Sequence, residues 1–452
     1  MRKRFAWILC LLITPLATWG QSAPIAITGT LVTPREIVPN GTVLIQNGKI
    51  LAAGARVQLP RGTTVIRTDG VIAPGLVDLH NHLTWNVFPR WKPIEEFGNR
   101  YEWQQKPVYK VLMDAPHAAL VSEGLECEME RYAEVKAISE GETSVVGGMY
   151  AACDQGLARN LDYDAELGSG LGKIIYNVFP LAMSEYDVAQ AVAALNAKPR
   201  GSLLIHIAEG SPHDASAAWE FSELEGRGLL KPGVSIIHGV ALTPQNFASM
   251  ATAGMGFIWS PRSNIELYGD TANVAAARTA GVLMALAPDW SPTGSDGLLG
   301  ELNYASVWNQ TQPTPPFTEQ DLVMMATSNA ASLVGLRDSI GSLEPNHAAD
   351  LIVVRDTGKA HNKDAYWSLT HATPEDLELV MIGGVATYGD PQLMREFPGS
   401  AAEMLKVCGT DKSISFISEK QKQGSFAETE STLDGALREM GRKLAPLAEC
   451  GN

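Results

Sequence analysis

The central part of the chain alternates between two kinds of segment. Apolar runs of four to six residues recur, and loop residues followed by amphipathic, helix-like sequence come after each of them. This alternation is typical of a parallel α/β domain. The expected strands are 76–79, 143–147, 157–160, 174–179, 202–207, 235–238, 256–259 and 282–287. Segments 184–197 and 243–253 have the pattern expected of two intervening helices.

The segments on either side of this region, residues 24–73 and 341–395, have the pattern of short strands joined by tight turns. Runs 42–46 and 49–53 flank Asn47-Gly48, which is a strong hairpin signal. Further runs of this kind are 341–345, 349–354 and 379–388. We expect the two flanks to pair into one small β-sandwich beside a central domain of residues 74–340. Residues 396–452 are more polar, with helical sequence at 432–447, and we interpret them as a C-terminal extension.

Residues that can bind metals close several of the central apolar runs. His80 and His82 follow the first run, His206 and His238 end two later runs, and Asp289 follows the last. A β/α barrel builds a metal site from ligands at the carboxyl ends of several parallel strands. A single histidine is more often a satisfied core or surface residue, but the ordered set favours metal binding. The pattern therefore indicates hydrolysis by a metal-activated water.

The N-terminus has the composition of a secretion signal. Arg2-Lys3-Arg4 precedes the apolar run 5–16, and small residues at 18 and 20 suit cleavage after Gly20. The alternative, a membrane anchor, requires a longer apolar run. We therefore expect residues 1–20 to be a signal peptide and the mature protein to be periplasmic or secreted, without membrane insertion.

Charge and cysteine content narrow the picture further. The net charge of −15 argues against nucleic acids and anionic membranes as partners. After signal cleavage four cysteines remain. An even number in an exported chain suits two disulfides, and we expect Cys127–Cys153 and Cys408–Cys450. Four buried thiols are the alternative. The sequence leaves open whether the chain forms a homo-oligomer.

Five short motifs together resemble the amidohydrolase superfamily over residues 24–395. They are PGLVDLHNH at 74–82, HIAE at 206–209, SIIHG at 235–239, SPRSN at 260–264, and GSLEP at 341–345 with ADLIV at 349–353. The branch resembled most is that of the cytosine deaminases, adenosine deaminases and chlorohydrolases. The resemblance implies a distorted (β/α)8 TIM barrel, a flanking β-sandwich, and a divalent metal inside the barrel mouth.

The resemblance also implies roles for individual residues. His80, His82, His206 and Asp289 are the implied ligands of one divalent ion, zinc first and iron second. Asp289 would also accept a proton from the metal-activated water, His238 would polarise the substrate, and Glu209 would carry a proton to the leaving nitrogen. Binuclear relatives carry a bridging Lys at the end of the fourth strand, where this chain reads Asn-Val-Phe-Pro at 177–180, so one metal is expected.

The sequence therefore predicts an exported, metal-dependent hydrolase of a non-peptide C–N bond in a small molecule. The bond would belong to an amide, a cyclic amide or an amino-heterocycle. A binuclear dipeptidase or N-acyl amino acid hydrolase is one alternative, and a non-catalytic binding protein on the same fold is another. The aromatic side chains after the first strand would wall the pocket for a planar or apolar substrate or pack within a lid; they are Trp85, Phe88, Trp91 and Trp103. Ser263 and Asn264 are expected to support the site rather than to contact the substrate.

Overall fold

The computed structural model describes residues 23–148, 152–153, 156–162, 171–397, 402–416 and 424–450. The predicted signal peptide, residues 1–20, lies outside these ranges. Among the described helices, none combines the length and the apolar character that crossing a bilayer requires.

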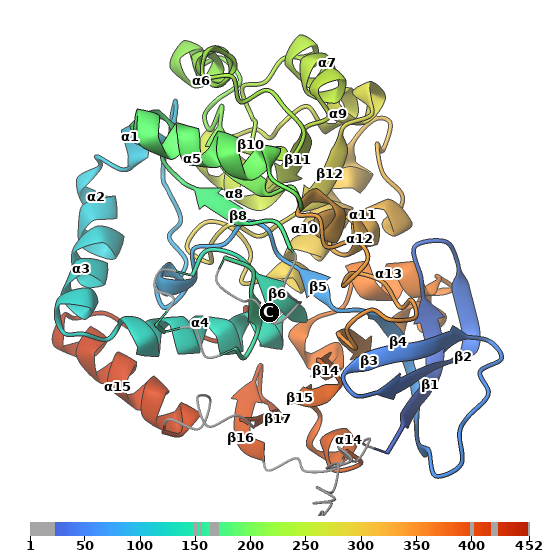
Figure 1. Ribbon diagram of the computed structural model, residues 1–452. Coiled ribbons are helices and arrows are strands. Elements are labelled where there is room, and N and C mark those ends of the chain that lie inside the picture. Colours follow the sequence, from blue (N-terminus) through green and yellow to red (C-terminus); the bar gives the residue numbers. More distant parts are fainter. Residues whose placement is uncertain are drawn as a thin grey trace, which may run out of the picture.

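All eight predicted central strands are present, and they pair in parallel (Figure 1). One sheet has the order β5-β6-β7 and the other the order β12-β11-β10-β9-β8. A parallel bridge between Asn81 and Asp289 joins the segments that follow β5 and β12. The strands are β5 (Leu76–Val77), β6 (Glu142–Val145), β7 (Arg159–Asn160), β8 (Ile174–Asn177), β9 (Ser202–Ile207), β10 (Val234–His238), β11 (Gly256–Trp259) and β12 (Leu283–Leu286). The fold is thus a mixed α/β fold with parallel sheets.

Helices separate the strands from β8 to β12, and local sequence sets the ends of these helices. The predicted segments 184–197 and 243–253 form α5 and α7, which begin at capping boxes on Ser184 and Thr243. Gly254, with φ 67°, ends α7. The helices between β7 and β13 are α5 (Glu185–Asn196), α6 (Ala215–Gly226), α7 (Pro244–Ala253), α8 (Pro261–Tyr268), α9 (Val274–Ala280), α10 (Leu298–Thr311), α11 (Glu319–Met325) and α12 (Ser328–Leu333).

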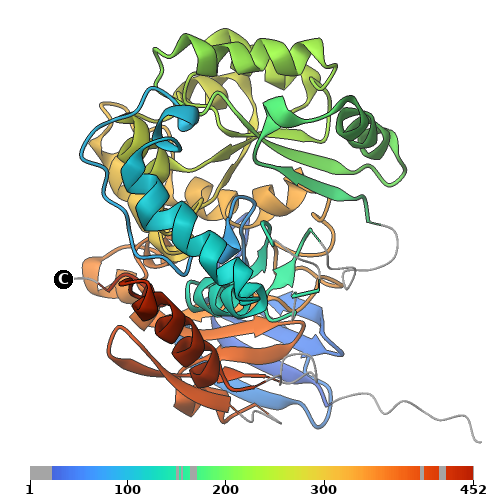
Figure 2. The ribbon, with the colours of Figure 1, turned by 90° about the vertical axis from the view of Figure 1, so that its left-hand side faces the viewer.

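A long helical insertion lies between β5 and β6. It contains α1 (Arg100–Trp103), α2 (Pro107–Tyr109), α3 (Ala115–Ser122) and α4 (Glu126–Ser139). The insertion also contains the four aromatic residues that were expected either to wall a pocket or to pack, Trp85, Phe88, Trp91 and Trp103. It runs along one side of the central strands (Figure 2).

The two flanks come together in one nine-stranded sheet of order β16-β17-β15-β14-β13-β4-β1-β2-β3. The strands are β1 (Ile25–Val32), β2 (Ile37–Gln46), β3 (Lys49–Gly54), β4 (Thr64–Pro74), β13 (Leu351–Val354), β14 (Leu377–Ile382), β15 (Val385–Gly389), β16 (Ala402–Val407) and β17 (Thr410–Ser415). The hairpin at Asn47-Gly48 is confirmed, since Gln46 pairs with Lys49. Pairing of the flanks is therefore observed, whereas their division into a two-sheet sandwich stays a prediction. The small helices α13 (Ala365–Thr370) and α14 (Pro391–Met394) accompany this sheet.

The C-terminal region differs from its predicted pattern. Strands β16 and β17 extend the nine-stranded sheet, and the helix predicted at 432–447 is instead α15 (Phe426–Glu439), which packs on α4 (Figure 2). The helix begins earlier because Ser425 forms a capping box with Glu428, and it ends before Gly441, which has φ 68°. Both predicted disulfides are present, Cys127–Cys153 and Cys408–Cys450.

Candidate active site

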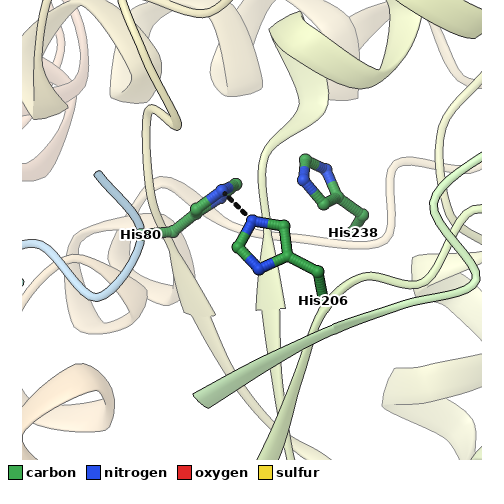
Figure 3. A group of neighbouring side chains, drawn as sticks. All are labelled: His80, His206 and His238. Atoms are coloured by element: carbon green, nitrogen blue, oxygen red, sulfur yellow. Dashed lines mark hydrogen bonds between the residues drawn. The ribbon is translucent and has the colours of Figure 1, made fainter. Parts of the chain in front are cut away.

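The predicted metal ligands meet at the carboxyl ends of the central strands. His206 is the second-to-last residue of β9, His80 and His82 follow β5, and Asp289 follows β12. His238 ends β10 and lies among them. Figure 3 shows the imidazoles of His80, His206 and His238 pointing toward one another. The structure therefore brings together residues that are more than 200 positions apart in the chain.

Short distances join the ligand atoms. His80 Nε2 lies 3.0 Å from His206 Nε2 and 3.0 Å from Asp289 Oδ1, and His82 Nε2 lies 3.2 Å from the same carboxylate oxygen. The potential ligand atoms form two groups, and within each group all the atoms lie within 4.8 Å of one another. One group is His80, His206 and His238, and the other is His80, His82 and Asp289. His80 belongs to both groups. The arrangement is a metal site of histidines with an aspartate.

The other nitrogen of each central imidazole is hydrogen-bonded. His206 Nδ1 donates to the Asn177 carbonyl at 3.0 Å, His80 Nδ1 lies 2.7 Å from Ser260 Oγ, and His238 Nδ1 lies 2.8 Å from Asn264 Oδ1. A proton held on Nδ1 leaves the Nε2 lone pair available for a metal. The supporting role expected for Asn264 is consistent with this contact.

The electrostatics of the site suit a divalent cation. Burial lowers the pKa of His80 to about 4 and that of His206 well below its ordinary value. Burial alone would raise the pKa of Asp289, but the adjacent His80 and His82 outweigh it and hold that pKa well below its usual range. Neutral imidazoles and an ionised carboxylate are the forms that ligate zinc. The donor set therefore fits the predicted metal.

Backbone conformation and a buried hydroxyl fix the position of two of these side chains. His238 has φ 66° and Asp289 has φ 73°, in the left-handed region that non-glycine residues seldom adopt. Such strained residues cluster at functional sites. Ser263 Oγ, on α8, donates to Asp289 Oδ2 at 2.5 Å, which leaves Oδ1 facing the histidines.

Glu209 lies at the edge of the histidine cluster. Its Oε2 is 3.7 Å from His238 Nε2, and the side chain is buried. Tyr268 donates a hydrogen bond to Oε1 at 2.7 Å, and Arg100 approaches Oε2 at 3.3 Å. Neither partner of Glu209 was predicted from the sequence. A helical spacing could have pointed to Tyr268, four residues after Asn264 on α8, whereas Arg100 lies in an insertion with no local motif.

A pocket with aromatic walls opens onto these residues. Its lining consists of His82, Trp85, Trp103, Gln104, Tyr109, Val178, Phe179, His206, Glu209, His238, Asp289 and Trp290. Trp85 and Trp103 therefore line the pocket, whereas Phe88 and Trp91 are buried in the core. Flat aromatic side chains favour the binding of a planar, largely apolar molecule.

The fourth central strand, β8, carries no lysine at the end that faces the histidines, as the sequence indicated. Strand β8 ends at Asn177, and Lys173 precedes its first residue, at the opposite end of the strand from the histidines. Tyr176 extends toward the site, where its hydroxyl donates to the Asn81 carbonyl at 2.9 Å.

Known proteins resemble this chain in sequence and in fold. Residues 185–386 match the Amidohydrolase family. A 5-methylthioadenosine/S-adenosylhomocysteine deaminase of Symbiobacterium thermophilum is 26% identical over 400 residues, covering 78% of this chain and 90% of the relative. A second, from Desulforudis audaxviator, is 25% identical, covering 81% and 95%.

Among solved structures, an adenosine deaminase from Xanthomonas campestris with bound Zn has a TM-score of 0.68 at 16% identity, covering 93% of this chain and 99% of that one. The guanine deaminase of E. coli has a TM-score of 0.62 at 17% identity, covering 80% and 98%. These structures share the fold. The prediction of an enzyme of the hydrolase class is confirmed, and the chain belongs to the amidohydrolase superfamily.

Proposed function

We propose that this protein is a metal-dependent deaminase of amino-substituted heteroaromatic compounds. The observation that carries the proposal is one pocket whose lining combines three of the four ligands with Glu209, His238 and aromatic walls; these ligands are His82, His206 and Asp289. The deaminase relatives support the same bond class, a C–N bond outside a peptide. The amino-heterocycle is thus favoured over the amide and the cyclic amide.

His80, His82, His206 and Asp289 would hold one divalent ion. Three imidazole nitrogens and a carboxylate are a common donor set for catalytic zinc, and iron is the alternative. When bound, such an ion supplies Lewis acidity and a water of lowered pKa. A single ion is favoured because β8 supplies no lysine at the end facing the histidines.

The reaction adds water to the ring carbon that bears the amino group and releases ammonia. Asp289 would accept a proton from the attacking water, and Glu209 would transfer a proton to the departing nitrogen. His238, whose Nδ1 donates to Asn264, would present Nε2 to the substrate and, in the form that carries a proton on Nε2 as well, would stabilise the developing negative charge. The aromatic walls would keep the ring in plane and exclude water from it.

The proposal also includes an architecture for the whole protein, beyond the pairing of strands that is observed. We propose that the eight parallel strands form a distorted (β/α)8 barrel over residues 74–340, and that the flanks form its sandwich. The bridge from Asn81 to Asp289, which joins the first and last strands, supports closure. It would also fix the distance between the ligands that follow the first strand and the ligand that follows the last strand.

We also propose that the protein is exported. The basic and apolar N-terminal pattern motivates this proposal, and the two disulfides suit an oxidising compartment. N-terminal sequencing of the protein from a cell envelope fraction tests it, with Gln21 expected as the first residue.

The proposed activity is tested with purified, metal-loaded protein. Ammonia release is measured with 5-methylthioadenosine, adenosine, guanine and an amino-triazine, and amides, cyclic amides and dipeptides serve as competing classes. Elemental analysis of the same samples counts the metal. We expect ammonia from at least one amino-heterocycle and about one ion per chain. Activity on dipeptides with two ions per chain would contradict the proposal, and so would the absence of any turnover.

A further inference from the structure

Both oxygens of the Glu209 carboxylate are held by side chains from other elements. Tyr268, at the end of α8, donates to Oε1 at 2.7 Å. Arg100, at the start of α1, reaches Oε2 at 3.3 Å. Arg100, Tyr268 and Glu209 are each at most 5% exposed. A long, flexible side chain is thus confined to one position at the edge of the pocket.

The hydrogen-bond direction at Tyr268 is fixed by its second partner. The indole Nε1 of Trp103 lies 2.9 Å from the Tyr268 hydroxyl. An indole nitrogen can only donate, so the hydroxyl oxygen accepts this bond and its single proton goes to Glu209. Because Trp103 also lines the pocket, a directed chain runs from the pocket wall through Tyr268 to the carboxylate.

Arg100 fixes the backbone of Glu209 as well as its side chain. The guanidinium bonds Glu220 Oε1 at 3.0 Å, and Glu220 Oε2 accepts the Ala208 N–H at 2.8 Å. Ala208 directly precedes Glu209 and has φ 56°. The guanidinium also donates to the Val178 carbonyl at 3.2 Å, on the pocket wall. Arg100 thus joins Glu209, the turn before it and the neighbouring wall.

We propose that Tyr268 and Arg100 are positioning residues for proton transfer by Glu209. This inference rests on the proposed function and assigns each carboxylate oxygen a task. Oε1 is committed to Tyr268, whereas Oε2 faces His238 Nε2 at 3.7 Å and therefore the reacting centre. The proton that Asp289 accepts from the attacking water would pass to Oε2 of Glu209 and from there to the amino nitrogen as its bond to the ring carbon breaks. Glu209 ends the cycle unprotonated, with water consumed and ammonia released.

The first test is Tyr268→Phe in the full, metal-loaded protein. The ring stays in place while the hydrogen bond to Oε1 is lost, so kcat should fall about 10- to 100-fold with KM nearly unchanged. Tyr366→Phe is the matched control, since its hydroxyl bonds the Thr33 carbonyl beside the nine-stranded sheet. The control should keep its kcat. Equal kcat values in the two variants would overturn the role of Tyr268.

Arg100 needs a charge-balanced design, because its removal alone would leave two buried carboxylates facing each other. In Arg100→Gln/Glu220→Gln, one positive and one negative charge are removed together. Glu220→Gln alone retains the Arg100–Glu209 pair and an amide oxygen for the Ala208 N–H. We expect the double variant to lose about 10-fold or more in kcat relative to Glu220→Gln alone. The same kcat in both would overturn the role of Arg100.

A comparison of leaving groups separates positioning from a merely structural role. Chloride leaves without being protonated, whereas an amino group requires a proton. On the same ring, Tyr268→Phe should therefore slow loss of the amino group by a larger factor than loss of chloride. Equal slowing of both reactions would overturn the inference.

Failure of the proposed function would show itself differently, as an absence of deamination by the unmodified protein. In that event a crystal structure of Tyr268→Phe decides the inference. Rotation of Glu209 away from His238 supports it, and an unmoved carboxylate overturns it.

Discussion

The two parallel sheets that supply the site are held together in different ways. The five-stranded sheet has continuous ladders, such as the one from Val234–Leu203 to His238–Ile207, and its central strands β9, β10 and β11 are buried along their whole length. In the three-stranded sheet, β5 and β7 are only two residues long. It supplies few backbone hydrogen bonds of its own, yet His80 and His82 depend on its placement.

Buried ionisable side chains stabilise the three-stranded sheet instead. Arg159, in β7, binds Asp350 through two nitrogens at 2.8 and 3.0 Å, next to the nine-stranded sheet. Glu142, in β6, accepts the first N–H of α10 at 2.7 Å, and Glu140 accepts the Gly300 N–H at 3.1 Å. Carboxylates at a helix N-terminus satisfy amides that have no partner within the helix. The half of the site beside the five-stranded sheet thus depends on continuous backbone ladders. The half beside the three-stranded sheet depends on long-range polar contacts.

The first prediction is that a substitution beside the five-stranded sheet can abolish catalysis without a change in the fold. Glu209→Gln keeps the size of the side chain but cannot carry a proton. Turnover should fall about 100- to 10,000-fold, the usual range for lost acid–base catalysis, while metal content and the unfolding temperature stay the same. Asp289→Asn should lose both turnover and metal. Near-normal turnover of Glu209→Gln on a true substrate would show that another residue carries the proton.

The second prediction concerns stability of the three-stranded half. Arg159→Met leaves the buried Asp350 without its guanidinium, which should cost about 3–5 kcal/mol in the free energy of unfolding. The matched control is Arg355→Met, because Arg355 pairs with Asp376 at 3.0 Å but is 55% exposed. Its cost should be about 0–1 kcal/mol. Urea unfolding of the metal-loaded proteins measures both, and equal costs would mean that the buried Arg159–Asp350 pair stabilises the three-stranded sheet no more than an exposed ion pair would.

The third prediction concerns the C-terminal segment that braces the three-stranded half. Ala445 donates to the Val87 carbonyl, Lys136 donates to the Pro446 carbonyl, and Glu449 pairs with Arg90. Cys450 fixes this segment to Cys408, 42 positions away. By loop entropy, Cys408→Ser/Cys450→Ser should lose up to about 4 kcal/mol of stability. Free thiols at both positions in the unreduced protein, detected by mass spectrometry, would contradict the pairing.

The fourth effect is a dependence of stability on pH. Burial, followed by the nearby Asp296, raises the pKa of Glu140 to about 8, against the hydrogen bond from Gly300 and the charge of Lys136. Folding therefore takes up a proton at Glu140 between the unfolded pKa, 4.5, and about 8. Across that window this group should lower stability as pH rises, by at most about 1.4 kcal/mol per pH unit.

Glu140→Gln tests this pH dependence, because it keeps an oxygen for the Gly300 N–H and cannot titrate. Thermal unfolding at several pH values in the window should show a flatter profile than that of the unmodified protein. Identical profiles would mean that Glu140 remains ionised in the folded state.

The sequence predicted most of the fold where local pattern and tertiary environment agree. The strand over 202–207 was predicted with its observed ends, and the hairpin at Asn47-Gly48 was predicted from its turn residues. The helix at 432–447 was misplaced because the capping box at Ser425 determines its start more strongly than the apolar spacing does. The candidate metal ligands could be predicted because strand ends and histidines coincide in the sequence.

What the sequence determined by itself is therefore the set of elements, the ligand types and the order in which they occur. A buried parallel strand is a continuous apolar run, and a histidine at its end is visible without knowledge of any neighbour. Tertiary structure alone decided which oxygen of Glu209 faces His238 and which helix holds the other. Arg100 lies 109 positions from Glu209 and Tyr268 lies 59 positions from it, in elements with unrelated local patterns. Such contacts depend on packing geometry and on the satisfaction of buried charge, which local periodicity does not encode.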